Sequence, residues 1–168
     1  MPMKRSIGSL FFLLLLLNCA KAQPPPLQDP FLDNFVGDWK VERTIRNKRT
    51  VQTTVHCEWV LNHQFVEFHY GAFDGKPEYE AFVFIGFDSN AKSYVCHWVD
   101  VFGATFSAIG NGKLDDKLLS LEIRFVPKDG ELINKFTFDP QTKTWTSLIR
   151  QTEKDEWVTF AEEKWTKK

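Results

Sequence analysis

The most constraining feature of this sequence is the even spacing of its β-rich runs from Trp39 onward. Short runs of Val, Ile, Thr, Phe, Tyr and Trp alternate with turn residues such as Asp74-Gly75-Lys76-Pro77 and Asp139-Pro140. Asp-Gly and Asn-Gly pairs favour tight hairpins. This spacing predicts strands at 38–46, 50–61, 64–72, 79–87, 92–99, 103–111, 117–126, 131–138, 144–152 and 156–165.

Several of these runs alternate between apolar and polar residues with a period of two. In 50–61, Val55, Cys57 and Trp59 share one face, while His56 and Glu58 share the other. This pattern is typical of strands with one buried face. By the same criterion, Asn134 shares a face with the apolar residues of 131–138, and the last run places Trp157, Thr159, Ala161 and Trp165 together.

About ten antiparallel strands in a meander leave two exposed edges, and closure into a barrel removes both. No segment shows helical periodicity long enough to cover a sheet, although Phe31 to Phe35 could form a short helical turn. The sequence therefore predicts an all-β, antiparallel up-and-down β-barrel of about ten strands with a short N-terminal helical turn. A two-sheet sandwich is the alternative.

The N-terminus has the order of a secretory signal peptide. Lys4 and Arg5 precede an apolar run, and Ala20-Lys21-Ala22 forms a cleavage pattern. The run is shorter than the about 20 residues of a membrane-spanning helix. We therefore expect a signal peptide at 1–22, export to a periplasmic or secreted location, and no stable membrane insertion after cleavage.

Two alternatives for this leader are a retained membrane anchor and lipid attachment at Cys19. The second is disfavoured because Asn18, rather than a small residue, precedes the cysteine. The predicted mature chain comprises a Pro-rich lead with the helical turn at 23–34 and a barrel domain at 35–168.

Cleavage would remove three of the 21 basic residues and none of the 22 acidic ones, leaving a net charge of −4. Nucleic-acid binding usually needs a basic surface, so no nucleic-acid partner is expected. The mature cysteines, Cys57 and Cys96, could pair in an oxidising compartment or remain two small buried side chains. They do not have zinc-type spacing, and no metal site is predicted.

Two sets of residues resemble a known family. The first is Phe35-Val36-Gly37-Asp38-Trp39, which resembles the G-x-W start of lipocalin-like barrels. The second is an ordered middle segment: Gly86-Phe87-Asp88, Lys92-Ser93-Tyr94-Val95, Trp98-Val99-Asp100 and Gly103-Ala104-Thr105. Together they resemble a bacterial exported, lipocalin-like (calycin-type) family of unknown function, over about Leu32 to Trp165.

The resemblance implies a barrel fold and no particular activity. Gly37 would allow a positive φ and Trp39 would plug one end, so both are expected to be structural. Related barrels bind haem through a histidine near the C-terminus, whereas this sequence has none after His97. No cofactor is therefore expected.

Arg43 is in phase with Trp39 and Val41, so it would be a buried cation if that face points inward. It would then need a carboxylate partner or an anionic ligand; the alternative is an arginine that reaches solvent. Asp100 could contact a ligand or cap a turn. His97, with His69 and Glu67, could bind a metal or transfer protons, or could be an ordinary surface residue.

The leading functional hypothesis is a barrel that binds a small apolar or amphipathic ligand. The predicted contacts are Arg43, Tyr94, Trp98 and Phe106, with Asp100 and His97 as further candidates. One alternative is an isomerase or hydrolase of a small hydrophobic substrate, although no residue is assigned as catalytic. Another is a structural domain with a filled core. The sequence does not indicate an oligomeric state.

Overall fold

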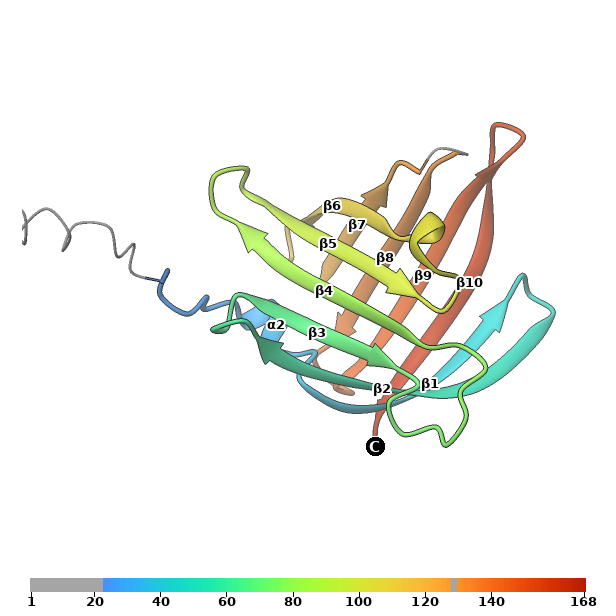
Figure 1. Cartoon of the computed structure of the whole chain (residues 1–168), viewed down its shortest axis with the longest axis horizontal. Coiled ribbons are helices and arrows are strands. Elements are labelled where there is room, and N and C mark those ends of the chain that lie inside the picture. Colours follow the sequence, from blue (N-terminus) through green and yellow to red (C-terminus); the bar gives the residue numbers. More distant parts are fainter. Residues whose placement is uncertain (1–22, 128–129) are drawn as a thin grey trace, which may run out of the picture.

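In the computed structural model, which describes residues 23–127 and 130–168, ten antiparallel strands form one closed barrel (Figure 1). The strands are β1 (Gly37–Ile45), β2 (Arg49–Val60), β3 (Phe65–Tyr70), β4 (Ala81–Asp88), β5 (Ser93–Asp100), β6 (Ala108–Leu114), β7 (Ser120–Phe125), β8 (Leu132–Asp139), β9 (Thr144–Glu153) and β10 (Glu156–Lys167). Each strand pairs with its sequence neighbours, and β1 pairs with β10 to close the barrel. The predicted up-and-down barrel is confirmed.

One end of the barrel is filled by aromatic side chains. The short helix α2 (Pro30–Asp33) precedes Phe35, whose ring stacks on Trp145 at a centroid distance of 3.7 Å. Trp39 is fully buried, and its indole Nε1 donates to the carbonyl of Phe35 at 2.6 Å. Gly37 has a φ of +125°, which disfavours any other residue at the start of β1. We call this the closed end.

The position of β6 corrects the sequence prediction. The expected strand at 103–111 begins only at Ala108 and continues through the expected Asn111-Gly112 turn. The turn lies earlier, at Gly103 (φ +88°) and the 3₁₀ helix η2 (Ala104–Phe106). The glycines of β6 serve packing instead, because a Cβ at Gly110 would lie 2.7 Å from the Phe125 ring.

A β-bulge in β10 corrects the predicted face of its first half. The register with β9 shifts between Thr159 and Ala161, which leaves Phe160 as the extra residue. Trp157 therefore does not share the inner face with Ala161 and Trp165, and the Arg124 and Arg150 guanidinium groups lie near its ring. Phe160 lines the barrel interior instead.

Cys57 and Cys96 are both buried and free. They lie on β2 and β5, so three strand spacings of about 4.8 Å each separate them along the barrel wall. A disulfide needs Cα atoms within about 7 Å of each other. Of the two alternatives for these cysteines, the structure shows two buried thiols.

The predicted signal peptide and Cys19 lie outside the described residues. Within 23–127 and 130–168, no helix is both long and apolar enough to cross a membrane.

Candidate ligand-binding cavity

The barrel interior is hollow at the end opposite Trp39. A cavity of about 410 Å³ lies between η2 and the strands β5 to β10, with β1 contributing Arg43. Its walls are mainly apolar and come from many strands. They include Trp98, Phe106, Ala108, Phe125, Leu132, Ile149 and Phe160. We call this space the apolar cavity, and it has the size and lining of a small-molecule site.

A second space of about 600 Å³ adjoins the first and is more polar. Arg43 and Phe160 line both spaces, and Tyr79 and Phe102 line the second. Its remaining walls carry charged and amide side chains from β2 and the β3–β4 loop, including Arg49, Gln52, Asp74, Lys76 and Glu78. Arg43 therefore stands where an apolar space meets a polar one.

Arg43 is paired with a buried carboxylate. It lies directly opposite Glu163 in the β1–β10 register, and its Nε is 3.2 Å from Glu163 Oε1. The Glu163 side chain is fully buried, and its Oε2 accepts a hydrogen bond from Trp165 Nε1 at 2.9 Å. Among the described residues, Arg43 Nε and Glu163 Oε1 have no well-aligned hydrogen bond. The pair is thus held by charge more than by directional bonding.

The surroundings of Arg43 keep it ionised. Burial alone would lower the pKa of Arg43, but the Glu163 carboxylate and the Tyr70 and Tyr79 hydroxyl groups outweigh burial and raise that pKa. The guanidinium also lies over the Tyr79 ring, 5.2 Å from its centroid. A cation over an aromatic face gains electrostatic stabilisation.

A hydrogen-bonded chain supports the same wall. Trp98 Nε1 donates to the Tyr79 hydroxyl at 3.0 Å, and that hydroxyl donates to Asp100 Oδ2 at 3.2 Å. Burial, followed by the Asp100 charge, raises the pKa of Tyr79 well above its ordinary value, so the phenol stays a donor. Asp100 Oδ1 also accepts from the backbone N–H of Phe102. Asp100 therefore fixes the turn and orients Tyr79.

Asn134 is a buried polar residue in the wall of the apolar cavity. Its Oδ1 accepts from Ser147 Oγ at 2.8 Å. Its Nδ2 has no hydrogen-bond partner in the described part of the chain. Because an unsatisfied buried N–H group is costly, an acceptor atom that reached Nδ2 would relieve that cost.

Some of the predicted ligand residues line the apolar cavity, and others lie elsewhere in the barrel. Arg43, Trp98 and Phe106 line the apolar cavity, and Asp100 lies behind it through Tyr79. Tyr94 is at the closed end, where its hydroxyl donates to Asp29 Oδ2 at 2.7 Å. His97 is exposed on the outer face of β5. Neither Tyr94 nor His97 reaches the apolar cavity.

The histidine cluster considered from the sequence is not assembled in a cavity. His69 Nε2 lies 3.0 Å from Glu80 Oε1, and the His69 ring stacks on Phe82. Within residues 23–127 and 130–168, no group of three or more His, Cys, Asp or Glu side chains is placed to hold a metal ion.

Sequence reasoning missed Glu163, Tyr79 and Phe160 as site residues. Glu163 was detectable, because it alternates with the buried residues Ala161 and Trp165. Phe160 was not, since the bulge brings it to the interior against the alternation. Asn134 was placed on the correct face but was not recognised as a donor.

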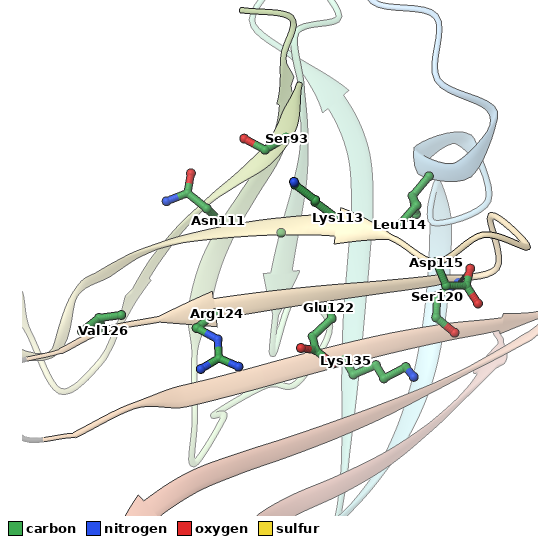
Figure 2. A pocket seen from close by; sticks show the side chains of 11 residues that line it. Ser93, Asn111, Lys113, Leu114, Asp115, Ser120, Glu122, Arg124, Val126 and Lys135 are labelled. Carbon is green, nitrogen blue, oxygen red and sulfur yellow. Dashed lines mark hydrogen bonds between the residues drawn. The ribbon is translucent and has the colours of Figure 1, made fainter. Parts of the chain in front are cut away.

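A further groove of about 630 Å³ lies on the outside of the barrel over β5 to β8. Figure 2 shows Glu122 and Arg124 on one strand beside Lys135 on the next. These side chains belong to the polar face of their strands, and Arg124 also pairs with Glu131. Charges of both signs face solvent there, so this groove is a weaker candidate than the apolar cavity.

Comparisons with known proteins identify a family without an assigned activity. A search of curated proteins found no significant match. Among solved structures, a redesigned β-barrel matches 82% of this chain and 94% of its own, at 12% identity and a TM-score of 0.36. That likeness is too distant to bear on function. The family model for "Protein of unknown function (DUF1579)" matches residues 25–166, and the chain therefore belongs to this family.

Proposed function

We propose that this protein binds a small amphipathic molecule in the apolar cavity. The observation that carries the proposal is a mainly apolar space of about 410 Å³ whose wall includes Arg43 and Asn134, and Asn134 Nδ2 has no partner among the described residues. A solid structural core would fill this space, as the aromatic side chains fill the closed end. A ligand with an apolar body in the cavity and a polar head near Arg43 and Asn134 would match both the apolar walls and the polar groups.

We place this function in an exported protein related to lipocalin-like barrels. The leader pattern at 1–22 supports export, and the Gly37-Asp38-Trp39 start supports the relationship. The net charge of −4 expected after cleavage supports a small-molecule ligand rather than a nucleic acid.

The proposal can be tested with a matched pair of variants on β6. Ala108 lines the apolar cavity, whereas its neighbour Ile109 is exposed on the outer face. Ala108→Phe should fill the cavity and weaken binding of the neutral fluorophore N-phenylnaphthylamine by about tenfold or more. Ile109→Phe should leave the dissociation constant unchanged.

Fluorescence titration of both variants and the wild-type protein measures this difference, and displacement by decanol shows that the site accepts an aliphatic ligand. Circular dichroism checks that Ala108→Phe remains folded. Equal weakening by both substitutions, or no saturable binding to the wild-type protein, would contradict the proposal.

A further inference from the structure

The charge of Arg43 is already compensated inside the barrel. Its Nε lies 3.2 Å from Glu163 Oε1, and the Glu163 side chain has no solvent exposure. Trp165 Nε1 holds the other carboxylate oxygen at 2.9 Å. Glu163 is thus fixed beside Arg43, and the two formal charges sum to zero.

This compensation changes which ligand head the cavity favours. A lone buried arginine would attract a carboxylate, as the sequence suggested, but here a ligand carboxylate would add a second negative charge beside Glu163. Asp100 adds a further carboxylate behind Tyr79, the residue over which the Arg43 guanidinium lies. Like charges repel strongly where solvent is excluded.

The polar groups that remain free can donate hydrogen bonds. Asn134 Nδ2 has no partner among the described residues, and its Oδ1 is already occupied by Ser147 Oγ. Arg43 has donors only. A complementary head therefore needs an acceptor oxygen, and it need not carry charge.

We propose that the apolar cavity selects ligands whose head is an uncharged hydrogen-bond acceptor, such as a hydroxyl, ketone or ester, and that Glu163 is the residue that excludes carboxylates. The inference rests on the proposed function and specifies the ligand class for the same site.

The test compares three ten-carbon probes with different heads: decanol, methyl decanoate and decanoate. Each displaces N-phenylnaphthylamine from the wild-type protein, at a pH where decanoate is ionised and at concentrations below micelle formation. Decanol and methyl decanoate should each bind with an affinity at least about tenfold higher than that of decanoate, because only decanoate adds charge beside Glu163. Equal or tighter binding of decanoate would overturn the inference and leave the proposed function standing.

Glu163→Gln removes the carboxylate and keeps an acceptor for Trp165 Nε1. It should improve decanoate binding relative to decanol by about tenfold or more. Glu162→Gln is the matched control, because Glu162 is exposed on the same strand and loses the same charge. Glu162→Gln should leave the preference unchanged, and an equal shift in both variants would contradict a local role for Glu163.

If Glu163→Gln does not fold, the pH dependence of decanoate binding to the wild-type protein still tests the inference. Decanoate binding should tighten as pH falls through the pKa of the fatty acid, since the protonated acid is a neutral acceptor. Decanoate binding that weakens under these conditions would overturn the inference. Absence of binding by the fluorophore and all three probes would instead contradict the proposed function.

Discussion

At the scale of single residues, the barrel interior is distinguished by the polar groups that it retains. Arg43 and Glu163 form a buried pair, and Asn134 with Ser147 forms another. Buried ion pairs often contribute little net stability, because desolvation offsets the attraction between the charges. Apolar residues of similar volume could fill these positions. Under the proposed function, these polar groups would serve ligand selection rather than stability.

The two cysteines lead to a prediction about reactivity. Burial raises the pKa of the Cys57 thiol well above its ordinary value, and it raises that of Cys96 as well. The thiolate is the reactive form, so both thiols should react with iodoacetamide at least about a hundredfold more slowly in the native protein than in denaturant. Intact-mass spectrometry over time measures both rates.

Ile109→Cys supplies an exposed thiol as the control for this experiment, because Ile109 is 63% exposed on the outer face of β6. That thiol should be alkylated promptly in the folded state. A protein that stays unmodified even in denaturant, with a mass lower by two hydrogens, would instead contain a disulfide and would contradict the structure.

At the scale of elements, the Asp29 carboxylate is one of the contacts that hold the N-terminal lead to the closed end. Asp29 Oδ1 accepts from the N–H groups of Phe31 and Leu32 at 3.0 Å each, and Asp29 Oδ2 accepts from Tyr94. One side chain thus caps α2 and joins it to β5. This contact also places the Tyr94 hydroxyl at the closed end rather than in the apolar cavity.

Asp29→Ala should lower the free energy of unfolding by about 2 kcal/mol, since it removes a helix cap and leaves a buried Tyr94 hydroxyl without its acceptor. Asp29→Asn keeps an oxygen acceptor and should cost less than half as much. Urea unfolding followed by tryptophan fluorescence measures both. If the two variants unfold at the same urea concentration, Asp29 does not act as a cap.

The elements also show what could be predicted from the sequence. The phase with Trp39 made a buried Arg43 one of two alternatives, and the structure shows Arg43 buried. Strand positions were predictable because alternation and turn residues are local signals. The Arg43–Glu163 contact was not, because it depends on the register of β1 with β10 across the closure of the barrel. Likewise, Gly110 was taken as part of a strand that ends in a turn, whereas its fit against Phe125 depends on the neighbouring strand.

At the scale of the whole molecule, stability and the proposed binding function separate to opposite ends of the barrel. The closed end holds the stacked rings of Phe35 and Trp145 and the fully buried Trp39. The other end holds the apolar cavity and the exposed ring of Phe106. Phe35, Trp39 and Trp145 do not line the apolar cavity, so we expect a change at the closed end to leave the cavity unaltered.

Phe35→Leu and Phe106→Ser test this separation. Phe35 is fully buried, so its truncation should lower the free energy of unfolding by about 1–3 kcal/mol and leave the affinity for N-phenylnaphthylamine unchanged. Phe106 is 66% exposed, so its replacement should change stability by less than about 0.5 kcal/mol and weaken binding severalfold through loss of a cavity wall. Urea unfolding and fluorescence titration of both variants give the four values. If Phe35→Leu weakens binding as much as Phe106→Ser does, the two ends are coupled, and the affinity depends on the packing of the whole barrel.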